Sequence, residues 1–328
     1  MRLSVLDLFP VGVNTSPSDV IRRSVDVVRT AESLGFERYW IAEHHNMPNI
    51  ATSAPEVLIA HLATQSERIR IGAGGIMLPN HTPLHVVEIF RTLEALHPNR
   101  IDLGVGRAPG TDPVTAAALH RSEDHDVDER LQELLAFERG LFPPDHPFSR
   151  IKPMPSDVRL PPIWMLGSTL AGATIGASIG VRYAFAGHFA MRHARQAIPL
   201  YRSRFRPSDD LKTPYAILAV TVICGDDDEH AQRLAAPLRV GVVHLRTGRP
   251  MPIVSVEDAL RHRFTPEEQA IVDDFMNGAV IGGPSHVRAG LEQLVQETGA
   301  DEIMLSTLMA DHDERLRSYR RVANAFRS

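Results

Sequence analysis

Short β-rich runs alternate with stretches of helical periodicity along almost the whole of this 328-residue chain. Runs such as "RLSVLDLF" (2–9) and "RYWIAEHH" (38–45) favour strands, whereas residues 18–34 repeat apolar side chains at helical spacing and end at Gly35. Such alternation predicts parallel strands in an α/β domain. We expect eight strands, each followed by a helix, over residues 2–9, 38–45, 68–78, 100–110, 162–168, 182–189, 215–224 and 301–307. Eight units in roughly 300 residues fit a (β/α)8 TIM barrel better than a doubly wound sheet of five or six strands.

The segment from about 237 to 282 departs from this alternation. It begins with "PLRVGVVHLRTGRPMPIV", which is rich in Pro, Arg and Gly, and continues with a short helical pattern that starts at "TPEEQAIVDDF". We interpret this segment as an insertion on the barrel rather than as a second domain. The sequence therefore predicts a single domain over residues 1–328.

Composition and charge exclude several classes of protein. The net charge of -5 is spread over many small blocks without a basic stripe, which argues against a nucleic-acid partner. No apolar run is long enough to cross a bilayer, and the N-terminus lacks the apolar core and cleavage site of a signal peptide. The single Cys224 excludes an internal disulfide and a cysteine-built metal site, and its apolar surroundings predict an inert buried thiol. We expect a cytoplasmic protein with no membrane partner.

The unusual residues gather where a (β/α)8 barrel carries its chemistry, at the C-terminal ends of the strands. Gly74 and Gly75 interrupt the third strand, and glycine in a strand indicates close approach of another group or an unusual peptide. The other strand ends carry polar side chains or further glycines, namely Glu43, His44, His45, Arg107, Gly167, Ser168, Thr169 and His188.

The block "EHHN" (43–46) combines a carboxylate with two imidazoles at a strand end. Acid–base chemistry by His44 and Glu43 is the functional interpretation, and a polar loop with surface histidines is the structural alternative. A metal-dependent hydrolase is a further alternative, but barrel hydrolases often carry His-x-His after the first strand, where this chain has only Asp7. We assign no metal ligands. We expect four other histidines to be surface residues of helices or loops: His61, His81, His85 and His120.

The stretch "GSTLAGA" (167–173) joins the fifth strand to a helix and predicts an anion site. Free N–H groups at a helix N-terminus, together with the hydroxyl of Ser168 or Thr169, suit a phosphate. Arg107 in "GVGRAPG" lies at the neighbouring strand end and can add a bidentate contact. The alternatives are an ordinary helix cap and an ion pair between Arg107 and a surface carboxylate. The glycine spacing does not match the dinucleotide fingerprint.

Several blocks of the sequence resemble the bacterial luciferase-like flavin monooxygenases. They are "YWIAEHHN", "IRIGAGGIMLPNHTPLHVVE", "NRIDLGVGRAPG", "MLGSTLAGA" and "GGPSHVRAGLEQLVQETGADEIMLST", which together span nearly the whole chain. The "RAPGTD" motif is similar to that of the single-chain branch of luciferase-family oxidoreductases rather than of the two-subunit luciferases.

The resemblance implies roles for individual residues. In these enzymes the third strand carries a non-prolyl cis peptide against which the isoalloxazine ring lies, and this bond matches Gly74–Gly75, with Ala73 beside it. Arg107 and Ser168, with Gly167 and Thr169 around them, match the phosphate ligands. His44 matches the active-site imidazole, with Glu43 as the group that would orient it. This chain departs from luciferase in having Gly106 in place of a reactive cysteine and Gly167 in place of an acidic residue, which argues against aldehyde bioluminescence and shifts phosphate binding towards backbone N–H groups.

The resemblance also implies a reaction. We expect an FMN-dependent monooxygenase that uses reduced flavin and dioxygen on a small organic substrate, and that forms a homodimer through its second and third helices. A separate flavin reductase is expected because the chain shows no nicotinamide fingerprint. The alternatives are a deazaflavin-dependent reductase or dehydrogenase on the same barrel, and a flavin-binding protein without catalysis.

Overall fold

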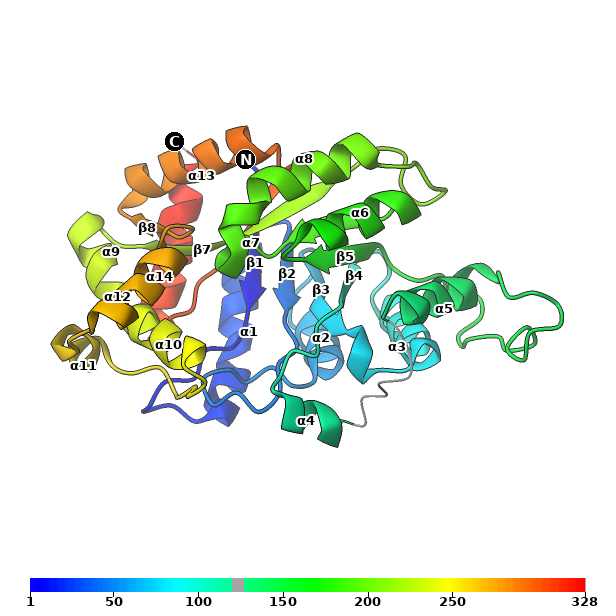
Figure 1. The fold of residues 1–328 in the computed structure, drawn as a ribbon, viewed down its shortest axis with the longest axis horizontal. Coiled ribbons are helices and arrows are strands. Elements are labelled where there is room, and N and C mark those ends of the chain that lie inside the picture. Colours follow the sequence, from blue (N-terminus) through cyan, green and yellow to red (C-terminus); the bar gives the residue numbers. More distant parts are fainter. Residues whose placement is uncertain (120–126, 328) are drawn as a thin grey trace.

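A computed structural model describes residues 1–119 and 127–327 and contains a closed barrel of eight parallel strands (Figure 1). Pairing of β6 with β7 closes the ring, whose order is β1-β2-β3-β4-β5-β6-β7-β9. The strands are β1 (Leu3–Asp7), β2 (Arg38–Ile41), β3 (Arg70–Met77), β4 (Ile101–Gly106), β5 (Ile163–Gly167), β6 (Arg182–Phe185), β7 (Ala216–Cys224) and β9 (Glu302–Ser306). The predicted (β/α)8 barrel is confirmed, and all eight predicted strands are present.

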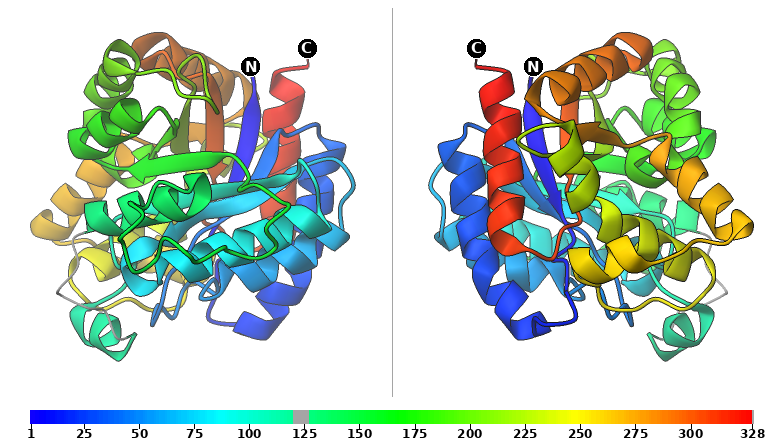
Figure 2. Two further views of the ribbon diagram at one scale, coloured as in Figure 1. Left: turned by 90° about the vertical axis from the view of Figure 1, so that its right-hand side faces the viewer. Right: turned by 90° about the vertical axis from the view of Figure 1, so that its left-hand side faces the viewer.

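A helix follows each barrel strand and covers the outside of the ring. These helices are α1 (Pro17–Ser33), α2 (Pro55–Thr64), α3 (Pro83–Leu96), α5 (Val127–Arg139), α6 (Leu170–Ile179), α8 (Ala194–Arg204), α13 (Pro284–Thr298) and α14 (His312–Ala325). Figure 2 shows the last of them, α14, beside α1, where the two ends of the chain meet on the barrel wall. Within the described ranges, no helix combines the length and the apolar character needed to cross a membrane.

Local sequence signals explain where these elements begin and how they pack. All nine residues of β7 are buried, as expected for a parallel strand covered on both faces. The side chain of Ser16 accepts a hydrogen bond from the backbone N–H of Asp19, and Pro17 occupies the first turn, so α1 has a favourable start. The buried face of α1, which includes Val20 and Val27, packs on the barrel at helical spacing.

Buried ion pairs fill the barrel at the N-terminal ends of its strands. Arg38 lies between two carboxylates, with Nη1 2.8 Å from Asp102 Oδ2 and Nε 2.8 Å from Glu302 Oε1. Asp102 also accepts a hydrogen bond from Nη2 of Arg70 at 2.7 Å. Arg38, Asp102 and Glu302 are all buried, so this end of the barrel is a packed interior whose charges are paired with one another.

The predicted insertion at 237–282 is present between β7 and β9, and it is more regular than the sequence indicated. It consists of most of α10 (Ala236–Arg246), then α11 (Val256–Arg261), α12 (Pro266–Met276) and a ninth strand, β8 (Val280–Gly282), which pairs with the end of β7. Figure 1 shows its helices gathered at one side of the molecule, near α9 (Asp228–Leu234). Of these elements, the sequence predicts α12 but not α10, α11 or β8.

Candidate active site

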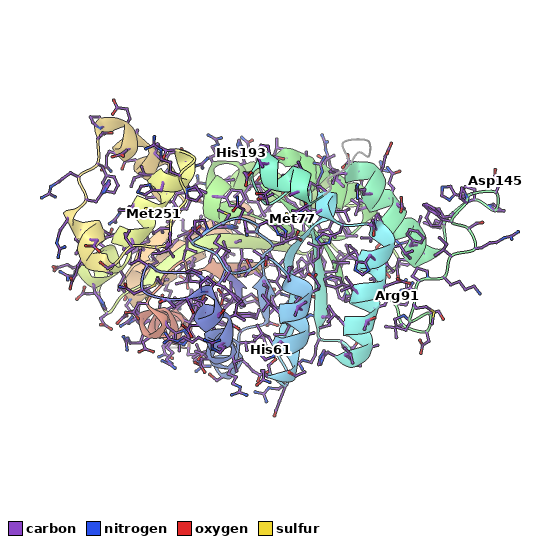
Figure 3. The ribbon with its side chains drawn as sticks, turned by 90° about the horizontal axis from the view of Figure 1, so that it is seen from below. His61, Met77, Arg91, Asp145, His193 and Met251 are labelled. Carbon is purple, nitrogen blue, oxygen red and sulfur yellow. The ribbon has the colours of Figure 1, made fainter. Side chains whose placement is uncertain are left out.

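A cavity of about 460 Å³ opens at the C-terminal ends of the barrel strands, and we call it the mouth cavity. β1 and β2 point downward in Figure 1, and Figure 3 views the structure from below, with the cavity residue Met77 near the middle. The polar side chains that line the cavity are His44, Arg107, Ser168, Thr169 and His188. Its larger apolar side chains are Leu6, Leu8, Met77, Val127, Leu166 and Phe189.

The turn between β5 and α6 forms one wall of the mouth cavity. β5 ends at Gly167, and α6 begins at Leu170 with Thr169 as its N-cap residue. No side chain caps this helix, so the first N–H groups of α6 lack the partner that a capping hydroxyl would provide. The ordinary cap, which was the alternative to an anion site, is therefore not formed, and Ser168 and Thr169 line the cavity instead.

Arg107 extends from the end of β4 into the same wall. Its Nη2 atom lies 3.2 Å from Oδ1 of Asp128, and a third of the side chain is exposed. Its Nε atom is buried and has no hydrogen-bond partner among the described residues. Arg107 thus forms the carboxylate pair that the sequence analysis gave as the alternative, while it also lines the cavity.

His44 and His188 line the mouth cavity as well. His44 follows β2, and His188 lies in the one-turn helix α7 (Gly187–Ala190), which follows β6. In each ring Nδ1 is buried and finds no hydrogen-bond partner within the described part of the chain. Burial lowers the pKa of His44 to about 4. Burial, and then the nearby His44, lower the pKa of His188 to about 3. Both imidazoles are therefore neutral at pH 7.

Among the described residues, the hydrogen bonds of Glu43 go to groups other than His44, the imidazole that it was expected to orient. The side chain is fully buried and accepts hydrogen bonds from the backbone N–H of Met77 at 2.7 Å and from Asn80 Nδ2 at 3.0 Å. Nε2 of His45 lies 2.9 Å from Oε1 of Glu43, and Nε2 of His81 lies 2.9 Å from Oε2. Glu43 therefore fastens the segment after β2 to the short 3₁₀ helix η1 (Leu78–Asn80).

The histidines expected at the surface fall into two groups. His61 and His85 are exposed on α2 and α3, as predicted. The prediction for His81 is wrong, because its ring is largely covered and bound to Glu43. His120 lies outside the described residues.

The glycines of β3 are close to neighbouring strands. The peptide bond between Gly74 and Gly75 is cis, at the position that the resemblance implied, and the pairing of β3 with β4 shifts register between Ala73 and Ile76. Gly74 lines the mouth cavity. A Cβ atom on Gly75 would lie 2.6 Å from the carbonyl oxygen of Gly104, and one on Gly74 would lie 2.8 Å from Leu6 Cδ1. Packing inside the barrel therefore accounts for part of this glycine pattern.

Comparison with known proteins identifies the family. A family model described as luciferase-like monooxygenase matches residues 1–302. The chain belongs to the luciferase-like monooxygenase family.

Two named relatives and a solved structure match the chain over nearly its whole length. A protein of Escherichia coli (strain K12) named luciferase-like monooxygenase is 39% identical over 323 residues, covering 97% of this chain and 95% of that protein. The N-acetyl-S-alkylcysteine monooxygenase of Bacillus subtilis (strain 168) is 31% identical over 333 residues, covering 99% and 98%. The crystal structure of apo-MsnO8 has a TM-score of 0.91 and 35% identity, and covers 99% of this chain and 97% of that one.

In this luciferase-like barrel, the mouth cavity includes side chains to which the sequence analysis gave no role. His188 was noted at a strand end, and that position was the one signal that could have identified it. Met77 and Phe189 also line the cavity, but an apolar residue near a strand end gives no distinguishing signal in the sequence.

Proposed function

We propose that this protein is an FMN-dependent monooxygenase that uses reduced flavin and dioxygen to oxidise a small organic substrate. One observation carries the proposal: a single cavity joins an arginine and an uncapped helix N-terminus to a pair of neutral imidazoles. The first two suit the phosphate of a flavin nucleotide, and the imidazoles suit proton transfer or hydrogen bonding near a reacting group. Membership of the luciferase-like monooxygenase family supports the class of reaction.

The residues around the start of α6 fit a phosphate group. The buried Nε of Arg107 and the first N–H groups of α6 are donors that would gain partners from phosphate oxygens. We assign Arg107, Gly167, Ser168 and Thr169 to phosphate binding. Gly167 has no side chain to accept a negative charge, so the backbone would carry more of the binding there.

We assign the flavin ring to the backbone of β3 and the proton chemistry to His44. Ala73, Gly74 and Gly75 would support the ring, and Gly74 is the member of this group that lines the cavity. The bound flavin would supply the oxygen-transfer chemistry. A neutral His44 can accept a proton or donate a hydrogen bond at the cavity wall, while side chains such as Leu8 and Phe189 exclude water. Glu43 would act indirectly, by holding the segment that carries His44.

A separate reductase would supply the reduced flavin in this proposal, because the chain shows no nicotinamide fingerprint. Oxygen uptake in the presence of FMNH2, above the background of free flavin, would support oxygenation. Uptake equal to that background would favour the flavin-binding alternative, and tighter binding of a deazaflavin than of FMN would favour the hydride-transfer alternative.

The phosphate assignment is tested by Arg107→Ala. The substitution removes a charge-assisted contact worth about 1.5–3 kcal/mol, so FMN should bind roughly ten- to a hundredfold more weakly. Riboflavin lacks the phosphate and should bind the wild type and the variant equally. Fluorescence titrations with both flavins measure the two affinities.

Asp128→Asn is the matched control, because it keeps Arg107 and removes the carboxylate that lies 3.2 Å from it. FMN affinity should be unchanged or higher in this variant, since the carboxylate competes with the phosphate for the guanidinium. An equal loss of FMN and riboflavin in Arg107→Ala would instead assign Arg107 to support of its loop. Unchanged FMN affinity in Arg107→Ala would show that Arg107 does not bind the phosphate.

A further inference from the structure

His44 and His188 approach the mouth cavity from opposite sides of the barrel. β2 and β6, which precede them, are four strands apart in the ring of eight, so they face each other across its axis. Both side chains line the cavity, and the charge state of His44 affects the pKa of His188. A ligand that enters the cavity therefore meets an imidazole on each side.

The fold fixes the position of His188. Its carbonyl oxygen accepts a hydrogen bond of 3.1 Å from Thr221 Oγ1 on β7, and its ring meets that of Phe189 edge to face at 4.6 Å. A Cβ atom on Gly187 would lie 2.7 Å from the carbonyl oxygen of Ala219, so this glycine lets α7 pack tightly against β7. His188 is thus held by its backbone and by a neighbouring ring.

In the part of the chain that the structure describes, the same ring atom, Nδ1, lacks a hydrogen-bond partner in both histidines. The Nδ1 atoms of His44 and His188 are buried and without partners among the described residues. Buried polar atoms without partners are rare in folded proteins, and each calls for an explanation such as a bound group. Glu43, which precedes His44 in the sequence, could have been a partner for that ring, but it is already bound to other groups. These are His45, Asn80 and His81.

The chemistry of the two rings restricts the group that they can bind. Both are neutral at pH 7, because burial lowers the pKa of each. A neutral imidazole offers one N–H donor and one acceptor nitrogen. A carboxylate would favour protonation of a ring, which burial and the second imidazole oppose, and an ammonium group would have to be stripped of water beside apolar side chains.

We propose that His44 and His188 form a pair that binds one uncharged polar group of the substrate, such as a hydroxyl or a carbonyl, so that His188 determines specificity together with His44. The apolar lining beside them, including Leu8 and Phe189, would take the hydrocarbon part of that substrate. The identification of this ligand as the substrate rests on the proposed function. The binding preference itself does not depend on flavin.

The preference is tested with four probes that each contain eight carbons in an unbranched alkyl chain: octane, 1-octanol, octanoate and octylamine. Calorimetry or ligand-observed NMR on the flavin-free protein should show that 1-octanol binds more tightly than the two charged probes. In His188→Phe, loss of one hydrogen bond should weaken 1-octanol about three- to tenfold and leave octane unchanged. His85→Phe, a substitution at an exposed residue of α3, is the matched control and should behave as the wild type.

Two further measurements separate binding from a structural role. In protein labelled with ¹⁵N-histidine, 1-octanol should shift the ring signals of both His44 and His188. The double variant His44→Phe/His188→Phe should lose less 1-octanol affinity than the two single losses predict together, because both rings bind one group. Tighter binding of octanoate than of 1-octanol, or unchanged 1-octanol binding in a folded His188→Phe, would overturn the proposal. Failure of FMN binding alone would overturn the proposed function and leave this pair intact.

Discussion

At the residue scale, adjacent residues of one short block have different structural roles. Glu43 and His44 are adjacent in "EHHN", yet Glu43 is bound within a buried cluster while His44 lines the mouth cavity. Hydrogen bonds from four residues hold the carboxylate in place, namely Met77, Asn80, His45 and His81. The sequence could indicate polar chemistry at this strand end, but the direction of each side chain depends on η1, which contacts it from another part of the chain.

The Glu43–His81 pair predicts a pH dependence of stability. Burial alone would raise the pKa of Glu43 and lower that of His81, but their hydrogen bond and opposite charges reverse both effects, so the pKa of Glu43 is lowered and that of His81 is raised. The contribution of Glu43 is present above its ordinary value of about 4.5 and is lost as the pH falls through its lowered pKa. The contribution of His81 is present below about 6.5 and is lost as the pH rises through its raised pKa.

The pair should therefore stabilise the protein most between about pH 4.5 and 6.5. His81→Gln should lower the free energy of unfolding by about 1.5–3 kcal/mol at pH 5.5, and by less at pH 8.5. Urea unfolding at the two pH values measures the difference, with the exposed His85→Gln as the control. An equal loss at both pH values would show that the charge on His81 does not contribute.

At the scale of elements, the approach of β3 to β4 depends on glycine. A Cβ atom on Gly104 of β4 would lie 2.2 Å from the carbonyl oxygen of Ala73 on β3. A backbone oxygen in a paired strand cannot move aside without disturbing the ladder, so the contact leaves no room for a methyl group. The close spacing therefore fixes the backbone of β3 next to Gly74, which lines the cavity.

Gly104→Ala should destabilise the protein by about 1–3 kcal/mol or more, because the added methyl group forces the two strands apart. Gly241→Ala is the matched control. Gly241 lies inside α10, and its Cβ would meet nothing within 4 Å, so this variant should gain about 0.5–1 kcal/mol from helix propensity. Thermal unfolding of both variants provides the comparison. A Gly104→Ala protein as stable as the wild type would mean that the barrel adjusts at this contact.

The elements that the sequence predicted are those whose signal is local. The eight barrel strands and the helix that starts at "TPEEQAIVDDF", α12, could be read from periodicity and composition. α10 was missed because Pro237 and Gly241 lower its helix propensity, although Pro237 lies in the first turn, where proline is tolerated. β8 is three residues long and exists through pairing with the end of β7, so its signal is not in its own sequence.

At the scale of the whole molecule, barrel topology gathers residues that are far apart in the sequence. Every strand ends on the same face, so strand-end position alone groups His44, Arg107, Ser168 and His188, and all four line one cavity. Which of these side chains would lack partners could not be predicted. That property depends on burial and on the direction of neighbours such as Asp128, which only packing determines.

The outer surface of the barrel contains the face, formed by α2 and α3, through which we expect the homodimer to form. α2 and α3 are adjacent on the barrel wall, and each carries an exposed large apolar side chain, with Val57 63% exposed and Leu96 62% exposed. Both helices run back along the barrel from the mouth, so Val57 at the start of α2 and Leu96 at the end of α3 mark opposite ends of this face. A stable interface buries about 800 Å² per partner, so the proposed interface would have to extend over both helices.

Light scattering should therefore give a particle of twice the chain mass of 36.3 kDa. Val57→Arg places an unpaired charge in the proposed interface and should shift the particle to the mass of one chain, because a buried charge without a partner opposes association. Val114→Arg is the matched control, since Val114 is 80% exposed on α4 (Pro113–Ala118), a helix that is not part of the proposed interface, and this variant should remain a dimer. A wild-type monomer would contradict the dimer, and dissociation of Val114→Arg but not of Val57→Arg would move the interface away from α2 and α3.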